Sequence, residues 1–215
     1  MKKALFITSF LVWPFIVQSQ DDPAARTLMD KLAKKAESYA SFKADFVITT
    51  IDLQDKSETS DKGTIFIKEN KYLLYMPGMD TYYDGKTVWT HLTDVQEVNI
   101  TEPGKDNSFL FGNPGQLFTF YQKDFKCFYS GDAEVNGKNL KMIELVPVDL
   151  KKEYSKIKIW VDDQALEMKS IRYYGKNGYH YTIDIKDFKT GLSLTDDFFI
   201  FDPKKHPEVE MIDMR

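Results

Sequence analysis

Apolar and polar residues alternate along most of this chain, as they do in strands that bury one face. The alternation begins at Phe42, where Phe42, Ala44, Phe46 and Ile48 are separated by mainly polar neighbours. After a polar turn at residues 54–62, further runs are expected at residues 63–68, 71–76, 82–83, 87–92, 96–100, 125–133, 139–146, 156–161, 167–174, 179–188 and 198–201. Turn pairs such as Asp84-Gly85 separate these runs, which is typical of antiparallel hairpins. The sequence therefore predicts one large antiparallel sheet.

A different period precedes the first strand. Leu28, Leu32 and Ala36 recur at the spacing of one helical face, and Asp22 followed by Pro23 is a typical helix start. These features predict one amphipathic helix over residues 23–39.

The segment from residue 102 to residue 124 breaks the strand rhythm. It combines several prolines and glycines with a set of large apolar residues. Asn113-Pro114 is again a helix start, so a short helix over the sheet is expected from residue 114 to about residue 123. The apolar residues of interest here are Phe109, Phe111, Leu117 and Phe118.

A sheet of this size has to cover its apolar face, because an exposed patch would aggregate. Two predicted helices offer little cover, which leaves two interpretations open. The helices complete an ordinary core, or the second one is a lid, hinged at residues 112–115, over a cavity for an apolar ligand. The expected class is mainly β with α: a large curved antiparallel sheet covered by an N-terminal helix and a short helical lid.

The N-terminus has the form of a secretory leader. Lys2 and Lys3 precede an apolar run that ends before the small residue Ser19. We expect residues 1–19 to be a cleaved signal peptide and residues 20–215 to form a single domain. The alternative is an uncleaved membrane anchor, against which both Pro14 and the short apolar length argue, since a span needs ~20 apolar residues. The single cysteine, Cys127, lies far from the cleavage point, so we expect no lipid anchor there.

Charge and motifs argue against several functions. The formal net charge is −4, and no basic block with interleaved aromatics is present, so nucleic acid is not an expected partner. The three histidines, at positions 91, 180 and 206, show no metal-ligand spacing, and no phosphate-binding glycine loop occurs. We expect no metal, no cofactor and no catalytic residue. A carboxylate pair at 162–163 or 196–197 is the remaining enzymatic alternative, although aspartates at turns ordinarily bond to the backbone.

Several segments together resemble the periplasmic outer-membrane lipoprotein carrier family, LolA. They are Ser41-Phe-Lys-Ala-Asp-Phe46, Gly63-Thr-Ile-Phe-Ile-Lys68 followed by Lys71-Tyr-Leu-Leu-Tyr75, Asp84-Gly-Lys-Thr-Val-Trp89, and Phe199-Ile-Phe-Asp-Pro203 with Pro207-Glu-Val-Glu-Met-Ile-Asp213. The resemblance implies an incomplete antiparallel barrel closed by helices, with a cavity for the acyl chains of a lipoprotein. It also implies a location in the periplasm, an inner-membrane lipoprotein-releasing transporter as donor, and an outer-membrane acceptor.

The resemblance suggests which residues line that cavity. Tyr75 and Trp89 match aromatic positions of the family, Phe66 falls on an aromatic position, and Leu73 falls on an apolar position near the cavity mouth. Each could equally be sheet core. With Phe46 and the four lid residues they form the candidate lipid-binding set.

One position departs from the family pattern. The family often has an arginine followed by proline directly after the strand at 63–68, and this arginine holds the lid. Here Glu69 and Asn70 occupy those positions. Glu69 is therefore the candidate latch position, and the latch has to use other groups.

The chain is accordingly expected to be a carrier that shuttles lipoproteins from the inner to the outer membrane. A carrier or sensor of another acyl lipid is the alternative, and a lipid-processing hydrolase is a weaker one. The acceptor of the family is anchored through a cysteine after its leader, and this chain has none there.

Overall fold

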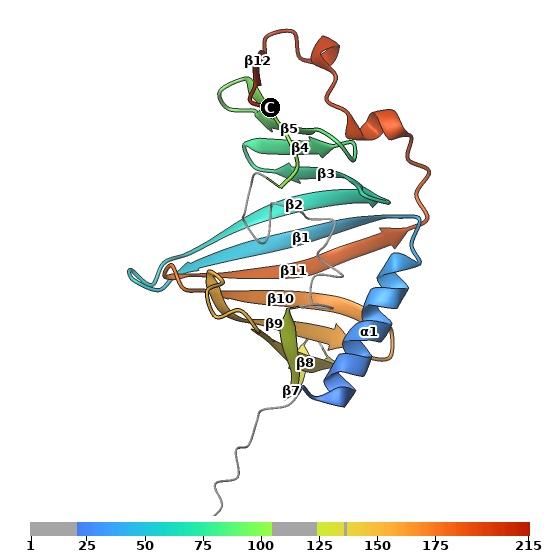
Figure 1. Cartoon of the computed structure of the whole chain (residues 1–215), viewed down its shortest axis with the longest axis vertical. Coiled ribbons are helices and arrows are strands. Elements are labelled where there is room, and N and C mark those ends of the chain that lie inside the picture. The colour runs from blue at the N-terminus through green and yellow to red at the C-terminus, as the bar shows by residue number, and fades with distance from the viewer. Residues whose placement is uncertain (1–20, 105–123, 136) are drawn as a thin grey trace, which may run out of the picture.

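The computed structural model describes residues 21–104, 124–135 and 137–215. Within them, twelve strands form one sheet in the order β12-β6-β5-β4-β3-β2-β1-β11-β10-β9-β8-β7 (Figure 1). The strands are β1 Ser41–Asp52, β2 Glu58–Lys68, β3 Lys71–Met76, β4 Met79–Tyr83, β5 Val88–Leu92, β6 Glu97–Thr101, β7 Phe125–Val135, β8 Lys138–Pro147, β9 Tyr154–Asp162, β10 Glu167–Gly175, β11 Tyr179–Thr190 and β12 Glu210–Asp213. The end strands β7 and β12 are not paired with each other, so the sheet stays open. The expected mainly β class and the incomplete barrel are confirmed.

Neighbouring strands are antiparallel except at one edge, where β12 runs parallel to β6. The turn at Asp84-Gly85 lies where it was expected. The Asp84 carboxylate accepts hydrogen bonds from the amides of Lys86 and Thr87, both at 2.8 Å. Gly85 has φ +97° there, a conformation that favours glycine.

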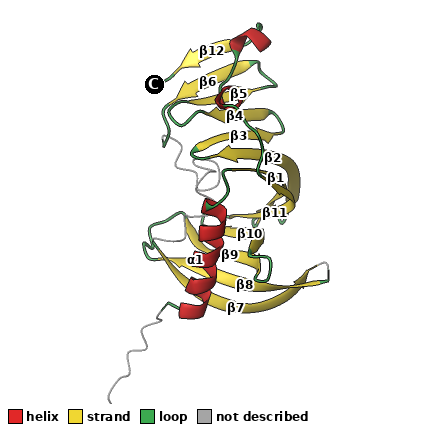
Figure 2. Cartoon of the chain, turned by 90° about the vertical axis from the view of Figure 1, so that its right-hand side faces the viewer, coloured by secondary structure: helices red, strands yellow, loops and turns green. Residues whose placement is uncertain are grey.

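The helix α1 spans Pro23–Glu37 and begins where the sequence predicted. The Asp22 carboxylate accepts hydrogen bonds from the amides of Ala24, at 2.9 Å, and Ala25, at 3.3 Å, which satisfies donors that the helix leaves free. Figure 2 shows α1 crossing the lower strands of the sheet. Its apolar side, including Met29 and Leu32, is buried in the main core.

Two predictions about strands were wrong. The turn expected at 54–62 is shorter, because β2 already pairs with β1 at Glu58, opposite Ile51. Residues 198–201 do not form a strand. A 3-10 helix, η3, occupies Asp196–Phe199 instead, and a second one, η4, follows at Pro203–Lys205. The strand β12 was not expected.

The sheet has two apolar faces, each with its own cover. The inner face carries the residues that share one core cluster with α1, among them Phe42, Ala44, Ile65 and Leu74. The outer face carries the residues that alternate with these. Over β4 to β6 the outer face is covered by the C-terminal segment, residues 191–215, through a second cluster that contains Val98, Ile100 and Phe201.

The start of α1 is tied to the edge strand β7. The Asp22 amide donates to the Cys127 carbonyl at 2.9 Å, and the Cys127 amide donates in return to the Asp21 carboxylate. Arg26 donates from Nε to Asp21 at 2.8 Å and from Nη2 to the Phe125 carbonyl at 2.5 Å. These bonds satisfy backbone groups of an edge strand that would otherwise lack a partner.

Candidate apolar binding site

Phe46 is the candidate site residue that lies on the inner face. It sits on β1 beside a bulge between Asp45 and Phe46 and directly opposite Gly63 of β2. A Cβ atom at Gly63 would lie 2.6 Å from the Met76 sulfur and closer still to the Phe46 ring. The missing side chain at residue 63 therefore makes room for an aromatic ring and a thioether that pack over the strand.

A cavity of about 450 Å³ opens at this place, where β1, β2 and β3 meet. Its lining joins Phe46, Gly63 and Met76 of the inner face to residues that alternate with them and belong to the outer face. These further lining residues are Asp45, Val47, Lys62, Thr64 and Tyr75, with Lys186 of β11. This volume lies within the range of roughly 300–1,000 Å³ that is usual for small-molecule sites. Of the described candidate residues, the cavity brings Phe46 and Tyr75 together.

The structure places the other described candidates on the outer face. Leu73 is opposite Phe66 on β2 and opposite Tyr82 on β4, and it is 1% exposed. The Phe66 ring packs edge-on against Phe198 of η3, with the ring centroids 5.1 Å apart. Trp89 packs against the second cluster. Phe66, Leu73 and Trp89 therefore do not share a face with Phe46.

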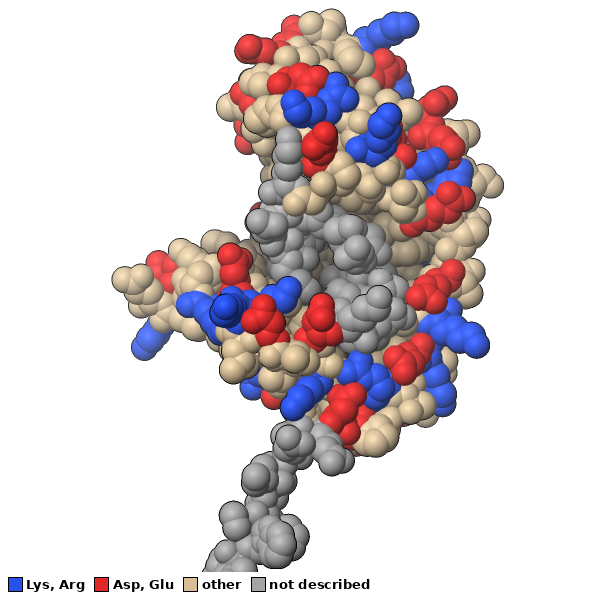
Figure 3. Space-filling view, in the orientation of Figure 1, with Lys and Arg blue, Asp and Glu red and all other residues tan. Residues whose placement is uncertain are grey.

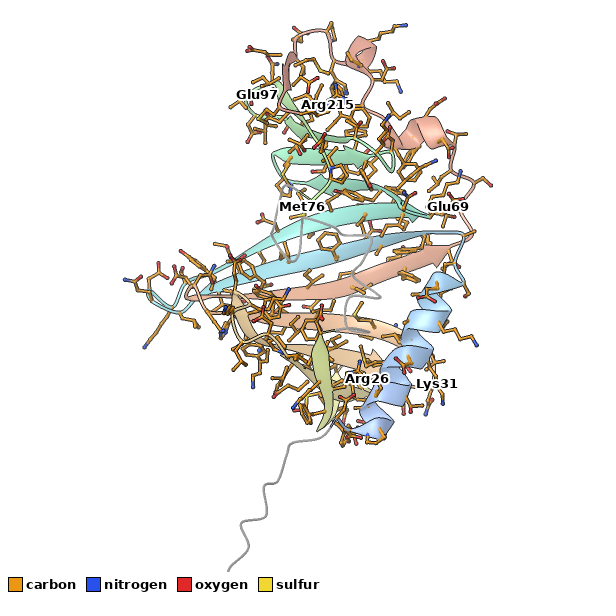
Figure 4. The ribbon with its side chains drawn as sticks, in the orientation of Figure 1. Arg26, Lys31, Glu69, Met76, Glu97 and Arg215 are labelled. Atoms are coloured by element: carbon orange, nitrogen blue, oxygen red, sulfur yellow. The ribbon has the colours of Figure 1, made fainter. Side chains whose placement is uncertain are left out.

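Glu69, the candidate latch position, lies in the turn between β2 and β3, at the opposite end of β3 from Met76 (Figure 4). It is exposed and has φ +55°. Its neighbours hold the C-terminal segment instead. Lys68 and Lys71 both pair with the Asp196 carboxylate, at 2.9 and 2.8 Å. These hydrogen bonds lower the pKa of Asp196 to about 2, Lys71 having the larger effect.

The two ion pairs of Asp196 with Lys68 and Lys71, which we call the clamp, were not predicted from the sequence. Asp196 was interpreted as a turn residue, and its partners are more than a hundred positions away in the chain. The sequence features that could have indicated this clamp are the two lysines on either side of the β2–β3 turn and the acidic residues at the start of η3.

A second contact holds the C-terminal segment on the outer face. The His91 side chain is 8% exposed and lies against Phe201 and His206, with ring centroids 5.4 and 4.9 Å away. Among the described residues, the His91 Nδ1 atom has no hydrogen-bond partner, and the Asp80 carboxylate is 4.0 Å from it. Burial, followed by the nearby His206, lowers the pKa of His91, while burial raises the pKa of Asp80.

Four candidate lid residues, Phe109, Phe111, Leu117 and Phe118, lie outside the described residues, as do the hinge at 112–115 and the leader. Within the described ranges, no group of three or more histidine, cysteine, aspartate or glutamate side chains could hold a metal ion. Over the face seen in Figure 3, basic and acidic side chains are interspersed.

An open, curved antiparallel sheet with a helix packed across its apolar inner face defines the class of incomplete-barrel proteins. The family described as outer membrane lipoprotein carrier protein LolA matches residues 16–173, and the chain belongs to this family. The chain is thus one of a family of extracytoplasmic carrier and binding proteins for lipids or lipoproteins. No curated protein matches it in sequence.

Two of the similar solved structures show the same fold at low sequence identity, with TM-scores above 0.5. An uncharacterized conserved protein from Thermus thermophilus is 10% identical, with a TM-score of 0.59 over 88% of this chain and 99% of that chain. A DUF1329 family protein from Desulfovibrio piger is 14% identical, with a TM-score of 0.52 over 85% and 98% of the two chains. A LolA superfamily protein from Nitrosomonas europaea is 15% identical, with a TM-score of 0.46 over 82% and 97%.

In the described part of the chain, no helix has the length and apolar character to cross a membrane.

Proposed function

We propose that this protein is a periplasmic carrier that binds the acyl chains of lipoproteins on the inner face of its sheet. It is secreted through a cleaved leader at residues 1–19 and moves its cargo from the inner to the outer membrane. It loads from an inner-membrane lipoprotein-releasing transporter and unloads to an outer-membrane acceptor. The chain itself supplies a binding site and no chemical step.

The energetics explain why such a cargo needs a carrier. Burying one methylene group contributes ~0.8 kcal/mol, so exposing a sixteen-carbon chain to water costs on the order of 12 kcal/mol. A carrier has to bury the chain and still release it. An adaptable apolar surface therefore suits the task better than a rigid, closely complementary pocket.

The observation that carries the proposal is the packing of Phe46 and Met76 over Gly63, beside the 450 Å³ cavity. A methionine side chain is flexible and polarisable, so it adapts to ligands of irregular shape. The ring and the thioether can move apart without breaking any strand pairing, because the three atoms nearest to a Cβ atom at Gly63 all belong to these two side chains. We propose that Phe109, Phe111, Leu117 and Phe118 complete the enclosure as a lid.

The first experiment asks what the protein carries. The full chain is produced with its leader in a diderm bacterium, purified from the periplasm, and analysed by intact mass spectrometry and lipid extraction. A bound acylated protein is the expected result, and an N-terminus at Gln20 is expected with it. Bound free lipid would change the cargo to another acyl lipid. If no lipid or acylated protein is bound and an added acylated peptide is not taken up, the carrier proposal is contradicted.

Variants on the two faces locate the site. Phe46→Ala removes an inner-face ring and is expected to weaken uptake of a palmitoylated fluorescent peptide at least about tenfold, which corresponds to ~1.4 kcal/mol. Phe66→Ala removes a ring of equal size from the neighbouring strand on the outer face and serves as the matched control. It is expected to leave uptake unchanged once stability is accounted for. Equal loss in both variants would contradict the assignment to the inner face.

A further inference from the structure

The outer face of the sheet holds a second cavity, of about 630 Å³, over strands β8 to β11. The β7–β8 hairpin, through Val135 and Lys138, contributes to its wall. We call it the Arg172 groove. Its lining includes four basic residues and one acidic residue, Asp184, although the whole chain is acidic.

The arginine at the centre of this groove is held in place without an acidic partner. The Arg172 Nε atom donates to the Thr182 hydroxyl at 2.9 Å, and Thr182 is 7% exposed. The guanidinium carbon lies 5.8 Å from the centroid of the Trp160 ring, in a cation–π arrangement. Among the described residues, no carboxylate lies within ion-pair distance of Arg172.

The lysines of the groove differ from Arg172 in this respect. Lys138 pairs with Asp162, Lys169 with Glu167, and Lys186 with Asp184. Among the basic residues of the groove, Arg172 is therefore the one without a described carboxylate partner, and its side chain is fixed by the Trp160 ring and the Thr182 hydroxyl. Since Nε is already used, the two terminal nitrogens of Arg172 remain for a planar, two-oxygen acceptor.

We infer that the Arg172 groove binds an acidic, extended segment of a partner protein, with a carboxylate on Arg172 and an apolar side chain against Trp160. The recessed position of Arg172 favours a protruding chain, because a flat bilayer surface does not reach the floor of a groove. The net negative charge of the protein also disfavours attraction to an anionic membrane. The attraction to an acidic partner thus comes from the basic residues of the groove and not from the net charge of the protein.

This site goes beyond the proposed carrier function. The Arg172 side chain lies on the opposite face from the Phe46 side chain, although Lys186 lines both this groove and the cavity beside Phe46. The side chains of Arg172 and Ser170 alternate with the inner-face residues Ile171 and Tyr173 along β10. A failure of the acyl-binding experiment leaves the test of this groove unaffected.

The test follows the indole NMR signal of Trp160 in the mature full chain. The probe is acetyl-Leu-Glu-Asp-Glu-Leu-amide, and its matched control is the same peptide with glutamine and asparagine in place of the acids. The acidic peptide is expected to shift the Trp160 signal in a saturable way and to leave the Trp89 signal unchanged. The neutral peptide is expected to bind at least about tenfold more weakly, as the loss of a charge-assisted hydrogen bond predicts.

Variants decide whether Arg172 is responsible. Arg172→Gln is expected to abolish the shift, and Arg172→Lys, which keeps the charge without the planar fork, is expected to weaken it. Lys189→Gln, on the same strand as Thr182 but outside the groove, is the control and is expected to bind like the original chain. Because Arg172→Gln could lose stability, its unfolding temperature is measured alongside. If this variant does not fold, Arg172→Lys still tests the groove, since it keeps the positive charge.

Three results would overturn the inference. The first is an equal shift with the acidic and the neutral peptide, and the second is binding by Arg172→Lys that matches the original chain. The third is a Trp160 shift given equally by inorganic phosphate or by phosphatidylglycerol vesicles, since the groove would then be a general anion site or a lipid site.

Discussion

At the scale of one residue, Gly63 leaves room on the inner face of the sheet for the Phe46 ring and the Met76 sulfur. Gly63→Val would place new carbon atoms where the Phe46 ring and the Met76 sulfur now lie. We expect a loss of roughly 1–3 kcal/mol in the free energy of unfolding, as for other overpacked sites. Urea denaturation measures it, and Thr59→Val, at an exposed position on the same strand, is the control.

A second variant separates overpacking from a backbone effect at the same position. Adding Phe46→Leu to Gly63→Val removes part of the ring that the new side chain meets, so stability is expected to recover in part. No recovery would show that the cost arises in the backbone of β2 and not in the packing above it.

The sequence predicted which residues of one strand share a face, but not how the faces of different strands combine. Alternation separates Phe46 from its neighbours on β1. The candidate set nevertheless joined Phe46 to Phe66 and Leu73, which lie on the other face. Whether a set of apolar residues lies on the inner or the outer face is determined by the segment that covers it. Helix α1 covers the inner face, and the C-terminal segment covers part of the outer face. These covers come from distant parts of the chain, so no local pattern reveals them.

At the scale of elements, the C-terminal segment depends on the clamp between Asp196 and the two lysines. Asp196→Asn is expected to speed amide exchange in residues 196–213 while exchange in β9 and β10 stays unchanged. Asp197→Asn is the matched control, because Asp197 makes no ion pair in the described part of the chain. Equal effects of the two variants would show that η3, and not the clamp, holds the segment.

The pH dependence of the clamp follows from the direction of the pKa shift. The pKa of Asp196 is lowered from 3.8 to about 2 by its lysine partners. The contribution of the clamp is therefore present above pH 3.8 and is lost as the pH falls from there toward 2. Amide exchange at residues 196–213 should rise over this interval in the original chain and much less in Asp196→Asn.

His91 predicts a second pH effect on the same segment. Burial lowers its pKa below 6.5, so the native contact with Phe201 favours the neutral ring. Its contribution is present above pH 6.5 and declines as the pH falls toward the lowered pKa, while Asp80 opposes the loss by pairing with the charged ring. His91→Phe keeps an aromatic ring beside Phe201 and should remove the pH dependence of exchange at residues 200–213 between pH 6.5 and pH 3.8, while the dependence due to Asp196 at lower pH remains. His180→Gln should leave that dependence in place.

The two incorrect strand predictions have physical causes at this scale. Residues 58–62 are polar and exposed, yet they form the start of β2 because β1 continues opposite them and pairs with their backbone. Residues 198–201 are all apolar and were predicted to form a strand. Phe199 and Phe201 are instead buried by packing on the outer face without joining the sheet. Backbone pairing and burial were decided by distant partners in both cases.

For the molecule as a whole, the proposed binding of an acyl chain on the inner face requires that face to open, and the reactivity of Cys127 measures such opening. Its thiol lies on β7 beneath the start of α1, it is 0% exposed, and burial raises its pKa to about 12. Since the thiolate is the reactive form, a thiol reagent is expected to modify the native protein slowly. Arg26→Gln removes bonds from α1 to Asp21 and Phe125, so it is expected to speed modification by roughly tenfold, as the loss of ~1.5 kcal/mol from a charge-assisted hydrogen bond predicts.

The same thiol tells where the acyl chain enters. If the chain inserts between α1 and the sheet, a palmitoylated peptide should speed modification of Cys127 in the original protein and have no effect in Phe46→Ala, which binds the peptide weakly. If the chain enters only beside Phe46 and Met76, α1 stays docked on β7 and the rate stays the same. Slower modification on binding would mean that the cargo tightens the contact of α1 with β7, and opening would then have to occur at the other half of the sheet.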